Sequence, residues 1–306
     1  ELRARQNPDG AYRYWPGSFE TQEFVSVYAQ HVLLEAVERG QAVPRDLMNQ
    51  GNEYLRFLAA RDGNTLADER SSAYALYLLT RQGETLGAEA SRLRERLESR
   101  YAKQSRGDIA TAYLASAMRL MKQDREAENL FAKIELTGER PVDRWHDDMT
   151  SDAELLYLSA LHFPQRLENL PPGFMERLVE RITRNGYHSL SAATTLLALD
   201  AYAKVAAPQA AGKLKLMEVV ADGKMRALAL PEGLFPKADF SADAAQLRFD
   251  NGATLPAYTS VAQSGFDRTP PKDALRDRFE HLREYLDKDG KPINSIKQGD
   301  EDTVRL

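Results

Sequence analysis

The chain has 306 residues, of which 42% are hydrophobic and 28% charged, a balance typical of an ordinary globular fold. Its 41 Lys and Arg residues against 46 Asp and Glu residues give a formal net charge of -5. Because no basic stripe is present that could neutralise phosphates, nucleic acid is not an expected partner. The absence of cysteine excludes disulfides and thiolate chemistry within these residues. The apolar run 190–207 is interrupted by Thr194, Asp200 and Lys204, so we expect no membrane span.

Dense apolar segments recur along the first two thirds of the chain, and each is long enough for a helix. They cover residues 20–39, 68–81, 107–121, 150–162 and 190–205. Tyr28, Tyr74, Tyr113 and Tyr157 occupy similar depths in the first four, and Leu197 takes this place in the fifth. The spacing of roughly 40 residues is that of a repeated helix hairpin.

Amphipathic segments alternate with the apolar ones, at residues 46–60, 88–101, 125–134 and 173–184. In 88–101, Leu93 and Leu97 form one stripe and charged residues cover the rest, as in a helix with one face in solvent. Apolar helices enclosed by one-sided helices predict two concentric layers. We therefore expect a mainly α fold, an α/α toroid over residues 1–206 that lacks its first helices. Residues 1–6 lack the apolar core of a signal peptide, and we expect the chain to be part of a longer protein.

Short alternating segments replace the helical period after Pro208. Runs at 213–220, 224–230, 245–249 and 258–264 are separated by turn signals such as Asp222-Gly223 and Asn251-Gly252, and they predict strands of a smaller antiparallel β region. Asn251-Gly252 in particular predicts a hairpin, since both residues tolerate positive φ. A proline-rich break at 269–271 precedes a further turn at Asp289-Gly290. We expect a β segment at 207–265 and the start of a β-sandwich at 266–306.

Five runs resemble the alpha-2-macroglobulin family of bacteria. They are 7–17 (NPDGAYRYWPG), 143–146 (DRWH) with 152–158 (DAELLYL), 190–202 (LSAATTLLALDAY), 265–268 (GFDR) and 283–287 (REYLD). The first is similar to a loop of the thioester-containing domain, and the last two to the junction with the following macroglobulin domain. The resemblance covers essentially the whole chain and implies the order thioester-domain-like toroid, CUB-like sheet, macroglobulin-like β-sandwich.

The resemblance implies a non-enzymatic protease inhibitor, which traps proteases by a conformational change after its bait region is cleaved. The implied partners are proteases, other domains of the same parent chain and a peptidoglycan synthase, and the implied location is the periplasm or cell envelope. A Cys-Gln thioester, where members of the family carry one, cannot lie in this cysteine-free chain. No cofactor and no metal are expected.

Aromatic residues in the two loops of the resemblance form the candidate interaction surface, which comprises Tyr12, Tyr14, Trp15, Trp145 and His146. Tyrosine and tryptophan concentrate at binding surfaces, and Phe19 could extend the platform. Packing inside the ring of helices is the alternative interpretation of these aromatic residues.

Acidic residues before the segment 150–162 support an alternative function. Paired carboxylates at the rim of a toroid can act as general acid and base on carbohydrates, and the candidates are Asp143, Asp147, Asp148, Asp152 and Glu154. Ser151 or Asp152 could instead cap a helix N-terminus, and His146 with Asp147 and Asp148 lacks a second histidine for a metal site. His31, His162 and His188 stand isolated in the sequence. A carbohydrate-active enzyme and a scaffold for cell-envelope proteins remain the alternatives.

Overall fold

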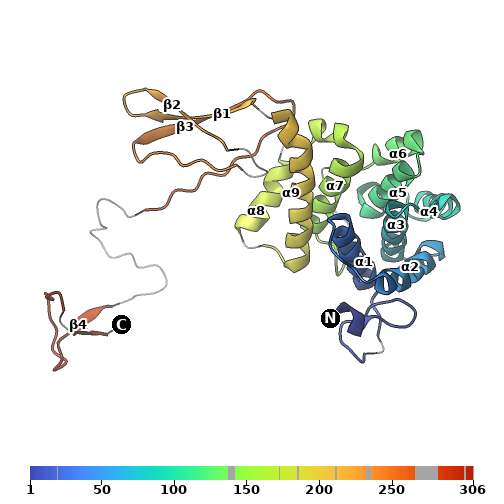
Figure 1. Ribbon diagram of the computed structural model, residues 1–306, viewed down its shortest axis with the longest axis horizontal. Coiled ribbons are helices and arrows are strands. Elements are labelled where there is room, and N and C mark those ends of the chain that lie inside the picture. Colours follow the sequence, from blue (N-terminus) through green and yellow to red (C-terminus); the bar gives the residue numbers. More distant parts are fainter. Residues whose placement is uncertain are drawn as a thin grey trace. The chain divides into compact units, whose positions relative to one another are not determined.

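The computed structural model describes residues 1–18, 20–136, 142–171, 173–184, 186–210, 212–231, 236–265, 282–299 and 301–305. The chain divides into two compact units, residues 1–257 and residues 258–306, and each is described by itself. The first unit contains the helices and one β-sheet, coloured from blue to orange in Figure 1.

The apolar helices of the first unit are α1 (Glu23–Glu38), α3 (Leu66–Arg81), α5 (Ile109–Leu120), α7 (Asp148–His162) and α9 (Ser189–Ala210). Each of them packs against the next one, from α1 through to α9. Their side chains are buried nearly all round in α3, α5 and α7. In α1 and α9 one face stays exposed, with Val32 at 47% and Leu196 at 69%.

The one-sided helices are α2 (Arg45–Ala60), α4 (Gly87–Arg100), α6 (Asp124–Phe131) and α8 (Phe174–Thr183), and each buries a single stripe. Short 3₁₀ helices lie at η1 (Leu2–Arg5), η2 (Gln104–Gly107) and η3 (Pro164–Asn169). Each one-sided helix packs against the apolar helix that precedes it (Figure 1). The mainly α fold is therefore confirmed. The predicted enclosure holds for α3, α5 and α7, whereas α1 and α9 each leave one face exposed.

Side-chain caps fix where α3, α5 and α7 begin. The Thr65 hydroxyl accepts from the backbone N–H of Asp68, whose carboxylate accepts from Thr65 in return, and this is a capping box. Asp108 caps α5, and Asp147 caps α7 through the N–H of Thr150 at 2.7 Å. The cap of α7 is thus Asp147, and neither Ser151 nor Asp152 takes that place as the sequence suggested.

The β-sheet of the first unit follows α9. Strand β1 (Leu214–Val220) lies between β2 (Met225–Leu228) and β3 (Ala244–Asn251), and both pairings are antiparallel. The predicted turn at Asp222-Gly223 joins β1 to β2, with Gly223 at a φ of 83°. Helix α9 itself continues to Ala210 with Pro208 in its last turn, so the change from helix to strand comes later than Pro208.

The predicted hairpin at Asn251-Gly252 is wrong, because the described chain forms no strand from Gly252 to Gly265. The Asn251 side chain binds the N–H of Ala253 and the carbonyl of Leu255 and turns the chain locally. Leu255 is then buried in the helical core, and the Tyr202 hydroxyl of α9 donates to the carbonyl of Pro256 at 2.8 Å. These contacts with the helices replace the partner strand.

The second unit contains a short antiparallel pair, β4 (Glu284–Leu286) and β5 (Thr303–Arg305). The predicted turn at Asp289-Gly290 is present, with the N–H of Gly290 donating to Asp287 and a φ of 78° at Gly290. Residues 266–281, and with them much of the expected junction and sandwich, lie outside the described part of the chain.

Candidate functional site

The loop at 7–17 is attached to α1 and α2 through Tyr12. Its N–H donates to the Ser26 hydroxyl at 2.8 Å, and Gln30 reaches its phenol at 3.3 Å. Gly10 has a φ of 87°, and a Cβ at this position would lie 1.9 Å from the carbonyl oxygen of Gln50, so only glycine fits this approach. Tyr12 is therefore a buried anchor of the loop, 1% exposed.

Tyr14 and Trp145 come together beside α1, with ring centroids 6.2 Å apart. Trp145 stacks on Phe24 at 5.0 Å, and Phe24 stacks on Tyr28 at 5.9 Å, so the loop at 143–146 is packed on the start of α1. Trp15 lies apart from this row. It is 71% exposed, with the guanidinium of Arg5 5.9 Å from its ring centroid, and Phe19 lies outside the described residues.

His146 is buried behind the aromatic row, in a cluster of charged residues. Its Nδ1 lies 3.2 Å from both carboxylate oxygens of Asp143, and its Nε2 lies 3.7 Å from Glu154 of α7. The guanidinium of Arg70 of α3 binds Asp108 at 2.7 Å and also binds Asp143. Most of the candidate surface is therefore packed against the helices, and its exposed ring is Trp15. The packed residues are Tyr12, Tyr14, Trp145 and His146.

The charges of this cluster depend on one another. Burial disfavours the charged imidazole of His146, but its hydrogen bond to Asp143 and the nearby carboxylates of Glu154 and Asp143 outweigh it, so the pKa of His146 is raised. Burial also raises the pKa of Glu154, against the opposing influence of His146 and Tyr113. A cavity of about 10 Å³ adjoins His146, Tyr74 and Tyr113, which leaves room for a single water molecule at most.

The carboxylates of the alternative enzyme hypothesis are engaged in contacts that stabilise the fold. Asp143 binds Arg70 and His146, and Asp147 caps α7. Asp148 pairs with Arg181 at 3.3 Å, and Asp152 pairs with Arg177 at 3.2 Å. Within the described residues, no group of three His, Cys, Asp or Glu side chains is arranged to hold a metal ion. In that same part of the chain, no helix is long and apolar enough to cross a membrane.

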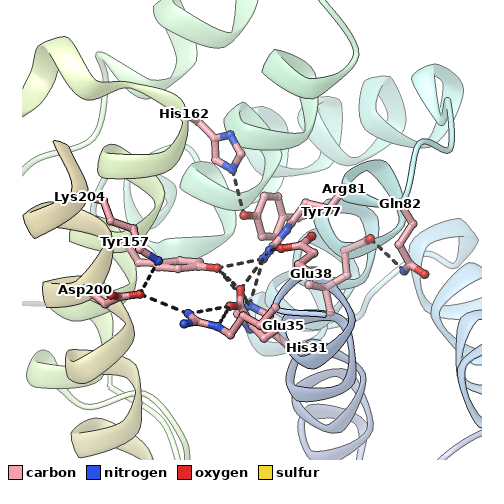
Figure 2. Close-up of polar contacts among 12 residues, drawn as sticks. His31, Glu35, Glu38, Tyr77, Arg81, Gln82, Tyr157, His162, Asp200 and Lys204 are labelled. Atoms are coloured by element: carbon pink, nitrogen blue, oxygen red, sulfur yellow. Dashed lines mark hydrogen bonds and ion pairs between the residues drawn. The ribbon is translucent and has the colours of Figure 1, made fainter. Parts of the chain in front are cut away.

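A second polar cluster, which the sequence did not reveal, joins α1, α3 and α7 near their C-terminal ends (Figure 2). Arg81 of α3 donates to the Tyr157 hydroxyl at 2.9 Å, to Glu35 at 3.0 Å and to Nε2 of His31 at 3.2 Å. The Tyr157 hydroxyl donates to Glu35, and His31 binds the Tyr74 hydroxyl. We call these residues, His31, Glu35, Tyr74, Arg81 and Tyr157, the central network.

The protonation states in the central network follow from its geometry. Burial, with the charge of Arg81 nearby, lowers the pKa of His31. Nε2 of His31 lies between a donor and an acceptor, 3.2 Å from the guanidinium of Arg81 and 3.4 Å from the carboxylate of Glu35. The pKa of Glu35 is lowered because hydrogen bonds from His31 and Tyr157 and the charge of Arg81 together outweigh its burial.

Ion pairs extend the central network to α9. Arg39, which follows α1, pairs with Glu35 at 3.2 Å and with Asp200 of α9 at 3.3 Å, and Lys204 binds Asp200 at 2.8 Å. Figure 2 shows these side chains converging from α1, α3, α7 and α9. The only local signal in the sequence was the placement of His31 and Glu35 one helical turn apart within an apolar helix.

The geometry defines a helical-hairpin module with an attached β-sheet, in which the buried charges serve packing. No family model matches the chain. The chain is 35% identical over its whole length to an alpha-2-macroglobulin homolog of Yersinia pestis, and 32% identical over 98% of its length to an alpha-2-macroglobulin of Pasteurella multocida. It spans about a sixth of these curated relatives, 16% of each.

A structure of Escherichia coli alpha-2-macroglobulin activated by porcine elastase matches 99% of the chain with a TM-score of 0.57 at 18% identity, and the match covers 27% of that protein's chain. This likeness shows the fold. The chain belongs to the bacterial alpha-2-macroglobulin family and corresponds to one segment of its much longer relatives.

We predict that His146 stabilises the fold less as the pH rises. A histidine with a raised pKa contributes stability that is complete below its unfolded-state pKa of 6.5 and is lost as the pH passes the folded-state pKa. The difference in free energy of unfolding between the wild type and His146→Gln, measured by urea denaturation, should therefore shrink from pH 6 to pH 9.

Asp143→Asn is the companion variant for this test. It removes the negative charge of the carboxylate that favours the charged imidazole. The stability lost through His146→Gln above pH 6.5 should therefore be smaller in the Asp143→Asn background than in the wild type. A difference between wild type and His146→Gln that grows with pH would contradict the assignment.

We also predict that Tyr157→Phe lowers the free energy of unfolding by about 1–3 kcal/mol, because Arg81 and Glu35 each lose a buried hydrogen-bond partner. Tyr101→Phe is the matched control. Its hydroxyl donates to the carbonyl of Asn64 at an exposed position, so its loss should cost about 1 kcal/mol or less. If urea denaturation gave equal losses in free energy of unfolding for the two variants, the central network would stabilise the fold no more than an exposed hydrogen bond does.

Proposed function

We propose that the chain is a segment of a non-enzymatic protease inhibitor, a bacterial alpha-2-macroglobulin that traps proteases by a conformational change after bait cleavage. The observation that carries the proposal is the match along the whole chain to alpha-2-macroglobulins, at 35% and 32% identity. One matching structure is of an Escherichia coli protein activated by elastase and another is of one activated by trypsin. Proteases are accordingly the proposed partners.

The internal contacts support a mechanical role for the helices. The central network and Arg39–Asp200 connect α1, α3, α7 and α9, and Arg70 connects α3 to the start of α5. Because buried ion pairs are costly to break singly, these helices should move together as one body when the parent protein changes conformation. The carbohydrate-active alternative loses its support, since Asp143, Asp148 and Asp152 have partners within the fold and Glu154 is buried beside His146.

We further propose that residues 1–206 are the thioester-domain-like part, residues 207–265 a CUB-like β segment and residues 266–306 the start of a macroglobulin-like β-sandwich. The periplasm or cell envelope is the proposed location. A peptidoglycan synthase is proposed as an additional partner, on the resemblance alone, and would make the chain part of a scaffold as well as of a trap.

The trapping proposal predicts that the parent protein becomes more compact when it is treated with elastase or trypsin, and that it retains the protease. Small-angle X-ray scattering measures the radius of gyration, and size-exclusion chromatography measures the retained protease. Protease whose active-site serine has been blocked is the control and should change neither quantity. Unchanged dimensions together with free protease would sink the proposal.

Within the parent protein, we propose that Trp15 is the part of the candidate surface that contacts another domain. Trp15 is 71% exposed although the guanidinium of Arg5 lies over its ring, and a large exposed aromatic ring of this kind is typical of an interaction site. Trp15→benzoylphenylalanine in the parent protein should form photo-crosslinks, mapped by mass spectrometry, to residues beyond this chain. Phe57→benzoylphenylalanine is the control, since Phe57 is 59% exposed on the one-sided helix α2. Crosslinks confined to residues 1–257 would count against Trp15 as a contact.

A further inference from the structure

A cavity of about 170 Å³ lies among α4, η2, α5 and α6, away from the two clusters of buried charge. Its inner wall is formed by Leu97 of α4, Leu114 of α5 and Leu130 of α6, which are 3%, 0% and 7% exposed. The hydroxyl of Thr111 also lines it, but donates to the carbonyl of Ser105 at 2.6 Å. The inner wall therefore offers apolar surface with the Thr111 hydroxyl already satisfied, and Ser105 adds a second hydroxyl at a half-buried position of the lining.

Basic side chains line the same cavity: Arg94, Arg106 and Lys133. Lys133 is paired with Glu98, the acidic residue of the lining, at 3.3 Å. The pKa of Glu126 is lowered by a backbone hydrogen bond and by Arg125, and to a smaller extent by the charge of Arg94. The Glu126 carboxylate pairs with Arg125 at 3.3 Å and not with Arg94.

Two of the three basic side chains that line the cavity form no ion pair in the described part of the chain. Arg94 and Arg106 have no ion-pair partner among the residues that the structure describes. The lining of the cavity thus combines an apolar interior with excess positive charge, and a ligand that complements it needs an anionic head and an apolar body.

We propose that this cavity binds a short aliphatic carboxylate. An apolar cavity of about 150 Å³ accommodates benzene, so 170 Å³ suits a chain of roughly six carbons. The guanidinium group binds carboxylates through two parallel hydrogen bonds, which an ammonium cannot provide. Arg94 or Arg106 would bind the carboxylate group of the ligand, while Leu97, Leu114 and Leu130 would contact its aliphatic carbons.

The proposal is tested with sodium hexanoate and the intact protein, by saturation-transfer NMR titration. We expect a dissociation constant of about 1 mM or below. Hexan-1-amine should not bind, because it presents its positive charge to the same arginines, and hexan-1-ol should bind more weakly than hexanoate. Binding of the amine as tight as that of hexanoate, or no hexanoate binding at 10-fold the expected constant, would overturn the proposal.

Substitutions locate the binding. The double variant Arg94→Ala with Arg106→Ala should weaken hexanoate binding about tenfold or more, as expected for lost charge-assisted hydrogen bonds. Arg92→Ala is the matched control, since Arg92 lies on the same helix, is half exposed and pairs with Glu89 at 3.1 Å outside the cavity lining. The proposal fails if Arg92→Ala weakens binding as much as the double variant does.

A third variant tests the apolar part while leaving the charges in place. Ala102 is exposed and lines the cavity, so Ala102→Leu should fill the space without disturbing the buried core. Hexanoate binding should then fall at least tenfold although Arg94 and Arg106 are intact. Unchanged affinity in Ala102→Leu would place the ligand elsewhere and overturn the assignment.

Discussion

Arg81 carries a permanent charge into the interior of the helical unit, where its side chain is only 8% exposed. A charge removed from water is tolerated only where partners offset the loss of hydration. Those partners are Glu35 and His31 of α1 and Tyr157 of α7. The positions of α1 and α7 relative to α3 are therefore set by one guanidinium group, in addition to the less directional packing of their apolar side chains.

The same helix carries a second buried arginine at its other end. Arg70 binds Asp108 at the start of α5 and Asp143 in the loop before α7. Eleven residues separate Arg70 from Arg81, about 16 Å along a helix axis. Between the two arginines, Tyr74 stacks on Tyr113 at 4.4 Å. Helix α3 thus fixes its neighbours by directional contacts at both ends and by aromatic packing between them.

The helices were predictable from the sequence, because each apolar or one-sided segment contains its own periodicity, and a cap or a glycine marks the start of α3, α5, α7 and α8. The tyrosines chosen as markers also come together, as Tyr74 and Tyr113 do. The central network was not predictable, since His31 contacts residues 43, 50 and 126 positions away. The prediction of a hairpin at Asn251-Gly252 failed because contacts with residues distant in the sequence decide the structure there as well. The local preference for a hairpin is overridden by the burial of Leu255 and the bond from Tyr202 to Pro256.

The sheet of the first unit is tied to α9 at two points in the chain. Strand β1 begins four residues after α9 ends at Ala210, and the segment after β3 returns to α9, where Tyr202 binds the carbonyl of Pro256. A pull applied to the sheet is therefore shared between a covalent connection and a packed one on the same helix. Helix α9 is packed against α7, so a force on the sheet is transmitted from α9 to α7. A rotation of the sheet should therefore rotate the helices together and not separate one hairpin from the others.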